Sequence, residues 1–183
     1  NLYRTQWKDR TFTRNIRAQV TGAEDFTANL LGVDALHQGV EFDFTYKYSD
    51  KLNFTGMLSL GDWKWDNDLV DVPVFDEDQT QVDTISLPIA GLKVSDAAQT
   101  TAALGMLYKF WDKTSFTLDY NYFTDLYARI DVLNYANATS RPEDSWKAPA
   151  YSTFDASLRH GFNLGEFDTT VTVRVNNLLD TEY

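Results

Sequence analysis

The stretch Val40-Glu41-Phe42-Asp43-Phe44-Thr45-Tyr46-Lys47-Tyr48 places an apolar or aromatic residue at every even position and a polar residue at every odd position. Successive side chains of a β-strand point to opposite faces of the sheet. A strand formed by this stretch therefore has one apolar face and one polar face. The period of two residues predicts a half-buried strand, because an amphipathic helix would repeat every 3.6 residues.

The same alternation returns along most of the chain and predicts an all-β protein of about seven antiparallel strands with almost no helix. The apolar positions of the later stretches are Phe54, Gly56, Leu58 and Leu60; Leu104, Met106, Tyr108 and Phe110; Phe116, Leu118, Tyr120 and Tyr122; Phe154, Ala156, Leu158 and Phe162; and Val171, Val173 and Val175. We expect strands near residues 2–13, 38–48, 52–65, 98–110, 115–126, 151–162 and 168–179.

The connections between these strands alternate in length, which predicts an up-and-down meander with two unequal ends. Short connections lie at residues 49–51, 112–114 and 163–168, and long ones run from about 14 to 36, 66 to 97 and 127 to 149. Transmembrane β-barrels have this form, with short periplasmic turns, long extracellular loops and aromatic girdles. Aromatic residues flank the short connections here: Tyr46, Tyr48, Phe54, Tyr108, Phe110, Phe116, Phe162 and Phe167. The alternative interpretation is that these aromatics form the core of a soluble β-sandwich.

A membrane barrel would assign one environment to each face of the strands. We expect one set to share the lipid-facing side: Phe42, Phe44, Tyr46, Leu118, Tyr120, Val171 and Val173. We expect the intervening polar set to face inward: Glu41, Asp43, Asp119, Asn121, Asp155, Arg159 and Arg174. The reverse assignment would bury charge in hydrocarbon, at about 2–4 kcal/mol for each Arg or Lys at the midplane.

Composition excludes several classes of protein. The chain has no Cys and only His37 and His160, so it has no disulfide framework and no Cys/His zinc site. It contains no run of about 18 apolar residues, which a membrane-spanning helix would need. Its net charge of −11 argues against nucleic acid as a partner. No G-x-S-x-G, P-loop or H-E-x-x-H motif is present, and we expect His160 to lie near a membrane interface without a catalytic role.

Several stretches, in this order and spacing, resemble the C-terminal third of TonB-dependent outer-membrane receptors. They are Asn1 to Arg10, Gly39-Val40-Glu41 with its alternating aromatics, Leu52 to Trp65, Tyr151-Ser152-Thr153-Phe154-Asp155, and Asn177-Leu178-Leu179-Asp180-Thr181-Glu182-Tyr183. The last stretch is similar to the NLxDxxY segment near the end of the family's penultimate strand. The resemblance implies that residues 1–183 form part of one barrel domain, about strands 15 to 21 of 22. The last strand, the plug and the energy-coupling box would lie outside it.

The resemblance also implies a function for the parent protein. The parent would be a receptor in the outer membrane of a Gram-negative bacterium, not an enzyme, and would need no cofactor. It would take up a siderophore, vitamin, glycan or peptide by active transport, with outer-membrane lipid around the barrel and the TonB complex acting through the plug. Two other hypotheses stay open: a soluble acidic all-β module that binds carbohydrate or another ligand, and a passive porin. A detergent requirement would separate the first from the second, and a plug domain would separate the first from the third.

Candidate ligand-binding residues lie in the long connections. Trp63 and Trp65 have the opposite parity from Leu58 and Leu60, which predicts a bulge near Gly61-Asp62. These two indoles would either anchor at the outer interface or stack on a ligand. The proposed set of binding residues is Trp63, Trp65, Asp66, Asp68, Tyr135 and Trp146. The segment 66–97 is rich in Asp, and we expect a solvated loop there, with Ca²⁺ binding as the alternative.

Overall fold

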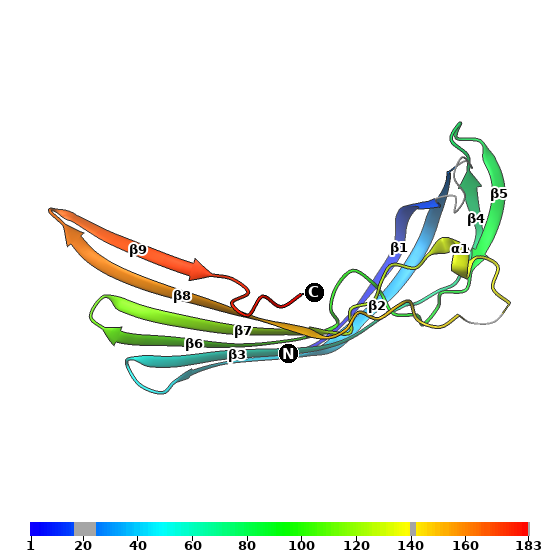
Figure 1. The fold of residues 1–183 in the computed structure, drawn as a ribbon. Helices are drawn as coiled ribbons and strands as arrows, with labels where there is room; N and C mark the ends of the chain where they lie inside the picture. Colours follow the sequence, from blue (N-terminus) through cyan, green and yellow to red (C-terminus); the bar gives the residue numbers. More distant parts are fainter. Residues whose placement is uncertain (17–24, 140–141, 183) are drawn as a thin grey trace.

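The computed structural model describes residues 1–16, 25–139 and 142–182, and within them it is almost entirely β-structure (Figure 1). The predicted all-β antiparallel fold is confirmed. Nine strands form one antiparallel sheet: β1 (Leu2–Ile16), β2 (Phe26–Lys47), β3 (Leu52–Trp65), β4 (Leu69–Phe75), β5 (Gln81–Leu87), β6 (Thr100–Trp111), β7 (Thr114–Thr124), β8 (Tyr151–Leu164) and β9 (Phe167–Val175). One short helix, α1 (Val132–Tyr135), lies between β7 and β8. In this part of the chain no helix has the length and apolarity to cross a membrane.

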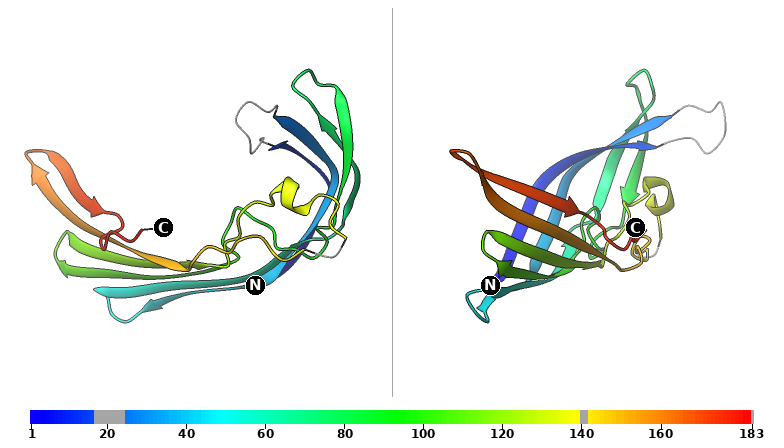
Figure 2. Two further views of the ribbon diagram at one scale, coloured as in Figure 1. Left: turned by 45° about the vertical axis from the view of Figure 1, so that its right-hand side comes forward. Right: turned by 60° about the vertical axis from the view of Figure 1, so that its left-hand side comes forward.

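Seven strands make the expected meander, in which β1, β2, β3, β6, β7, β8 and β9 pair with one another in that order. Tight connections join β2 to β3, β6 to β7 and β8 to β9 at one end, which we call the turn end (Figure 1). The opposite end, the loop end, carries the longer connections. Figure 2 shows that the sheet curves into an open trough, with α1 on its concave side.

The prediction of a long loop from about Arg14 to Leu36 is wrong for the described residues of this segment. β1 continues to Ile16 and β2 begins at Phe26, so most of the described part of this segment is hairpin; residues 17–24 lie outside the described residues. The alternation in β2 changes phase at Gly32, which has a φ of +68° and separates Leu30 from Val33 on the same face. This shift of phase breaks the two-residue period, and the strand is therefore not evident from the sequence.

The expected loop from Asp66 to Ala97 is corrected in the same way, because it contains the β4–β5 hairpin. β2 is 22 residues long and β3 only 14. Trp65, the last residue of β3, pairs with Ala35, so the part of β2 before Ala35 extends beyond β3. β4 then pairs with the edge that β3 leaves, through Thr27 with Phe75 and Ala28 with Val74. Pro73 lies inside β4 and weakened the strand signal, since proline lacks an N–H for the ladder. β9 ends at Val175, four residues before the expected limit.

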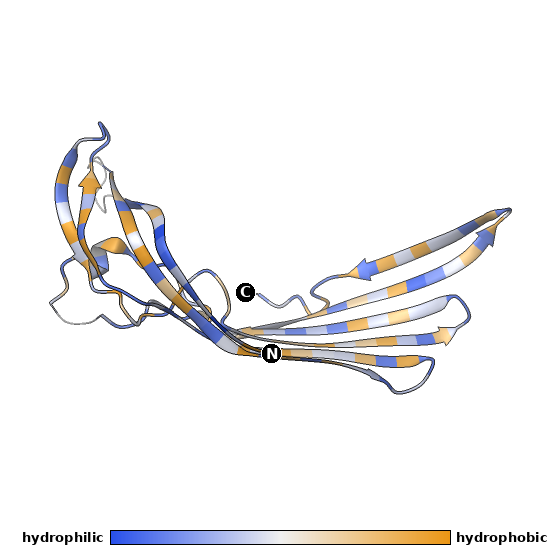
Figure 3. Cartoon of the chain, turned by 180° about the vertical axis from the view of Figure 1, so that it is seen from behind, coloured by the Kyte–Doolittle hydropathy of each residue, from blue (hydrophilic) through white to orange (hydrophobic). Residues whose placement is uncertain are grey.

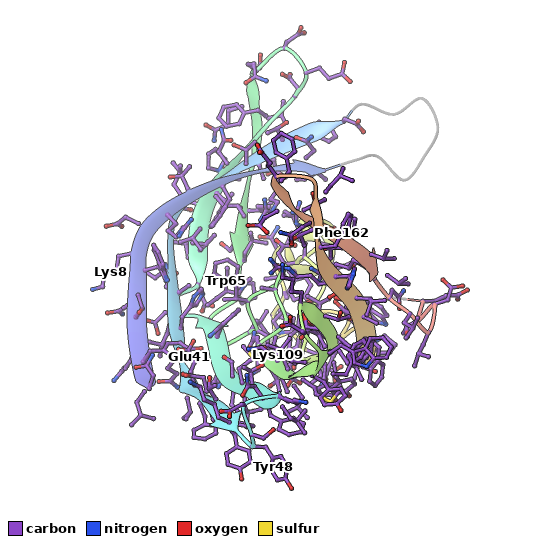
Figure 4. All side chains as sticks on the ribbon, turned by 90° about the vertical axis from the view of Figure 1, so that its left-hand side faces the viewer. Lys8, Glu41, Tyr48, Trp65, Lys109 and Phe162 are labelled. Carbon is purple, nitrogen blue, oxygen red and sulfur yellow. The ribbon has the colours of Figure 1, made fainter. Side chains whose placement is uncertain are left out.

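The strand register decides which side chains share a face, since directly paired residues point the same way. One row runs through Phe44, Gly56, Leu104, Tyr120 and Phe154, and the next through Tyr46, Phe54, Met106, Leu118 and Ala156. Val175, Val173 and Val171 continue this face on β9. The predicted common face is confirmed, and Figure 4 shows Tyr48, at its turn end, pointing away from the concave side. The alternation of apolar and polar residues along the strands is visible in Figure 3.

The only compact hydrophobic core within the described residues lies at the loop end. Its buried members come from β1, β2, β4, β5, the segment after β5, and α1: Ile16, Ala28, Leu30, Val33, Leu69, Val72, Val74, Ile85, Leu87, Ile89, Leu92, Val132 and Tyr135. We call this cluster the loop core. At the turn end, by contrast, the apolar face is uncovered, and Phe42 and Val173 are each 61% exposed. The sheet therefore has two parts, one stabilised by its own core and one with an unpartnered apolar surface.

Candidate functional site

The polarity of the two faces inverts beyond Leu60, at the loop end. On the convex face, the Asp62 carboxylate lies between the ammonium groups of Lys64 (3.0 Å) and Lys93 (2.7 Å). The hydrogen bond from Lys93 is the main cause that lowers the pKa of Asp62 to about 2. Ion pairs thus begin where the apolar rows of this face end.

The predicted bulge near Gly61-Asp62 is wrong. The β2–β3 register runs without a shift from Lys47 paired with Asn53 to Ala35 paired with Trp65. Trp63 and Trp65 continue the odd-numbered, concave face of β3, and Figure 4 shows Trp65 pointing into the trough. The opposite parity of the two indoles reflects a change of environment on a continuous strand, not a change of backbone phase.

Aromatic side chains from three strands meet on the concave side at this level. The His37 ring stacks on Trp63, with centroids 5.1 Å apart, and Trp7 contacts His37 edge-on, with centroids 6.2 Å apart. The indole N–H of Trp63 donates to the hydroxyl of Tyr3 over 2.8 Å. We call Tyr3, Trp7, His37 and Trp63 the aromatic ledge. Trp7 is 44% exposed and the other three are half-buried, so the ledge presents ring surface to the trough.

One cation borders the aromatic ledge. The Arg10 guanidinium lies 4.9 Å from the centroid of the Trp7 ring and 5.5 Å from that of Phe12. Burial, followed by the charge of Arg10, lowers the pKa of His37, which lies outside the apolar rows. The imidazole is therefore neutral at neutral pH. The ledge combines flat ring faces, a phenol hydroxyl and one guanidinium, which suit a ligand that carries a ring and a hydrogen-bond acceptor.

The six residues proposed from the sequence do not form one cluster. Trp63 belongs to the aromatic ledge. Trp65 lies further along the same face, packs against the loop core and contacts Phe12 edge-on at 6.0 Å between centroids. Trp146 is 69% exposed in the connection between β7 and β8.

The other three candidates hold the loops in place. Asp66 accepts a hydrogen bond from the Gln6 amide at 2.6 Å, and Asp68 accepts one from the backbone N–H of Ala90 at 2.8 Å. Tyr135 is buried in the loop core, and its hydroxyl donates to the backbone carbonyl of Glu143. Burial raises the pKa of Tyr135. These contacts give the three side chains structural partners within the protein.

Sequence reasoning missed Tyr3, Trp7 and His37. All three lie outside the clearly alternating stretches, so alternation assigned them to neither face. Their meeting depends on the register of β1 against β2, where Tyr3 pairs with Gly39 and Thr5 with His37. A single strand pattern does not contain that register, so the ledge was not predictable from alternation alone.

Two carboxylates of the acidic segment 66–97 have backbone partners. Asp76 accepts from the backbone N–H of Thr80, and Asp83 from that of Thr84. Across residues 1–16, 25–139 and 142–182, no three His, Cys, Asp or Glu side chains are grouped so as to hold a metal ion. His160 lies at the turn end, where its Nδ1 is 2.8 Å from the Thr114 hydroxyl and its ring stacks on Phe162.

Comparison with known proteins identifies the family. Residues 1–178 match the family model described as TonB dependent receptor-like, beta-barrel. Searches of curated proteins and of solved structures each gave no match. The family match covers nearly the whole chain, and the antiparallel meander with one apolar and one polar face agrees with it. The chain therefore belongs to the TonB-dependent receptor-like β-barrel family.

Proposed function

We propose that this chain is the C-terminal part of the barrel wall, about strands 15 to 21, of a receptor that takes up a scarce ligand across the outer membrane of a Gram-negative bacterium. TonB energises this uptake through a plug domain of the parent protein. The observation that carries the proposal is the family match over residues 1–178, because the family consists of outer-membrane receptors and transporters. This family is one of transporters and not of enzymes.

The convex face supports contact with lipid. Its apolar rows on β2 run from Val40 to Tyr48, which is about 27 Å along the strand at roughly 3.4 Å per residue. A strand tilt of about 40° reduces this to about 20 Å across the bilayer, close to the apolar band of about 25 Å in such barrels. In this arrangement the turn end is periplasmic and the loop end extracellular.

We assign ligand capture to the aromatic ledge, with Trp146 as an outer contact. Aromatic side chains near the apolar rows can serve as anchors in lipid, but the ledge lies on the concave side, which lipid does not reach. Its half-exposed rings suit a ligand with an aromatic or sugar ring. Each of the expected classes (siderophores, vitamins, glycans and peptides) includes members with such a ring, so the ledge does not select among the classes. Trp65, Asp66, Asp68 and Tyr135 support the loops around this site.

Growth and uptake assays test the transport function. The parent gene is deleted in its host, and growth is compared on limiting iron chelates, cobalamin, glycans and peptides. We expect one nutrient class to be lost, to be restored by the intact gene, and to stay lost when the intact gene is supplied to a strain without TonB. Uptake that persists without TonB would contradict the proposal and indicate a passive porin.

Substitutions in the intact receptor test the ligand site. With the nutrient from the growth assay, Trp63→Ala and Trp7→Ala should each weaken binding by about tenfold, since an aromatic contact is worth roughly 0.5–1.5 kcal/mol beyond its buried area. Trp111→Ala is the matched control, because Trp111 is 74% exposed at the turn end. Equal affinity of all three variants would exclude the ledge as the binding surface without affecting the transport assay.

A further inference from the structure

Gln99 is a buried polar residue at the point where β3 changes its partner. The β3–β6 ladder ends where Leu60 pairs with Thr100, and beyond this pair β3 continues to Trp65. Gln99 directly precedes Thr100 and is 1% exposed; among the residues that the structure describes, only Gln99 and Thr114 are both buried and polar. Burying an amide is unfavourable unless its polar atoms form hydrogen bonds, so the partners of Gln99 explain its position.

The side-chain amide of Gln99 takes the place of a peptide group in the ladder. Its Oε1 accepts from the backbone N–H of Trp63 over 2.9 Å, and its Nε2 donates to the backbone carbonyls of Trp63 and Val94, each over 3.0 Å. The backbone of Gln99 adds two bonds, in which its carbonyl accepts from Gly61 (2.7 Å) and its N–H donates to Asp125 (3.2 Å). One residue thus joins β3 to the segment after β5 and to the segment after β7.

The backbone of Trp63 is held from this side of β3. Trp63 directs both its N–H and its carbonyl away from β2, toward Gln99 and Val94. On the β2 side it therefore faces His37 as a non-hydrogen-bonded pair, the arrangement in which opposite side chains lie closest. This closeness allows the two rings to stack. Since the N–H of Trp63 bonds to Gln99, the amide of Gln99 fixes the backbone that carries the indole.

Two paired glycines leave room for the rings of the aromatic ledge. Gly39 pairs with Gly61 between β2 and β3. A Cβ at Gly61 would lie 2.8 Å from both the indole Nε1 of Trp63 and the carbonyl oxygen of Gln99, and a Cβ at Gly39 would lie 2.6 Å from the Tyr3 hydroxyl. The indole and the phenol therefore lie over bare backbone, where they bond to each other. Because no Cβ confines the indole there, its position depends on where the backbone of Trp63 is held.

We propose that Gln99 is a positioning residue of the ligand site: its side-chain amide holds Trp63, and through Trp63 the aromatic ledge, in the orientation that receives a ligand. This inference rests on the proposed function, which assigns ligand capture to the ledge. A side chain of similar size without the amide leaves the N–H of Trp63 without this acceptor and its carbonyl with one donor fewer.

Fluorine NMR of the intact receptor in detergent tests the positioning without any nutrient. The receptor is labelled with fluorotryptophan, and the resonance of Trp63 is assigned by its absence in Trp63→Phe. Gln99→Leu should shift or broaden this resonance. Gln81→Leu is the matched control, because Gln81 is exposed on β5, and it should leave the resonance unchanged. An unchanged Trp63 resonance in Gln99→Leu, with folding verified by heat-modifiable migration in gels, would overturn the proposal.

A double-mutant cycle tests whether Gln99 affects binding through Trp63. Affinity for the nutrient identified by the growth assay is measured for wild type, Gln99→Leu, Trp63→Ala and the double variant. We expect Gln99→Leu to weaken binding about tenfold in wild type, as loss of the indole does, and less than about twofold in the Trp63→Ala background. Equal losses in both backgrounds would overturn the proposal. Wild-type affinity in Trp63→Ala would instead refute the ledge as the ligand site, which is a failure of the proposed function that the NMR measurement distinguishes.

Gln99→Glu adds a test by pH. The introduced carboxylate still accepts from the N–H of Trp63 but cannot donate to a carbonyl, whereas its protonated form regains one donor. Burial raises the pKa of such a carboxyl, so we expect weak binding at neutral pH and a severalfold recovery relative to wild type at about pH 5. Wild type is measured over the same range because His37 also titrates, and Gln81→Glu should follow wild type. A loss of affinity in Gln99→Glu that does not change with pH would contradict the role of the amide.

Discussion

Val173 and Thr172 are neighbours in β9 whose side chains point to opposite sides of the sheet. Val173 pairs with Leu158 on the convex face, and Thr172 pairs with Arg159 on the concave face. The same alternation places most apolar side chains of the rows next to a polar one in sequence; Leu104 and Met106 on β6 are exceptions. A substitution at a single position therefore tests whether that face of the sheet contacts lipid or water.

Arginine substitutions at these two positions should differ strongly. In the intact receptor, Val173→Arg places a cation in lipid at a cost of about 2–4 kcal/mol and should reduce assembly into the outer membrane. Thr172→Arg adds a cation to an aqueous wall and should assemble as wild type. The amount of heat-modifiable receptor in outer-membrane fractions measures both variants. Equal assembly would refute the assignment of faces.

Asp125 gives a residue-scale prediction in acid. Lys147 donates to its carboxylate over 2.6 Å, and this hydrogen bond is the main cause that lowers the pKa of Asp125 from its ordinary value of 3.8. A lowered pKa stabilises the fold above the ordinary value, and that stabilisation is lost as pH falls through the lowered one. Peptides containing Ala128 and Ala148, whose amides bond to Trp146 and Leu126, should lose exchange protection below about pH 3.8 after correction for intrinsic rates.

The variant Asp125→Asn is the control for that prediction. It should show reduced protection of the two peptides already at pH 7 and a smaller change on acidification. Asp96→Asn removes the neighbouring ion pair with Arg129. This variant should lose exchange protection on acidification in the same way as wild type. An unchanged acid response in Asp125→Asn would show that another group controls the connection.

β2 determines the arrangement of elements because it is longer than β3. On one edge β2 pairs with β1. On the other edge its first part pairs with β4 and its second part with β3. The β4–β5 hairpin and α1 then enclose the loop core on the concave side, away from the apolar rows. The loop end thus has a hydrophobic core of its own, independent of lipid.

Leu87→Ala should separate the two parts of the sheet energetically. Leu87 is 1% exposed in the loop core, and truncating a buried leucine costs about 2–5 kcal/mol. We expect faster amide exchange in β4, β5 and α1, with unchanged exchange in β7 and β8. Val82→Ala, at an exposed position on the same strand, should change neither. A loss of protection across the whole sheet would show that the loop core and the barrel wall unfold together.

In the described residues the sheet is open and has unpaired edges. β1, β5 and β9 each pair on one side only. Unpaired edges carry free N–H and C=O groups, and barrels remove them by closure. The convex face adds an apolar surface larger than monomers normally expose.

The isolated 183 residues should therefore not form a soluble monomer. Without detergent we expect association through the edges and the apolar face, measured by light scattering, and with detergent we expect binding of the micelle. A monodisperse monomer in detergent-free buffer would show that the apolar face packs within the molecule. That result would favour the soluble β-module over a barrel wall.

The sequence alone determined the features that depend on the two-residue period. Strand identity, the meander, the short turns and the separation of apolar from polar faces follow from alternation, since each residue contributes independently to its face. The family resemblance was confirmed by the family match over residues 1–178, which includes the stretches at Gly39 and Tyr151 and ends inside the stretch that begins at Asn177. Tyr183, which ends that last stretch, lies outside the described residues.

The tertiary structure decided what depends on register and on phase. The break at Gly32 and Pro73 inside β4 concealed strands that pairing with β2 stabilises. The aromatic ledge brings together residues far apart in sequence, such as Tyr3 and Trp63, and the register of the sheet aligns Lys109 with Arg159 through Ser115. Alternation states which side of its own strand a residue occupies, but only the pairing of strands states which residues of other strands lie beside it.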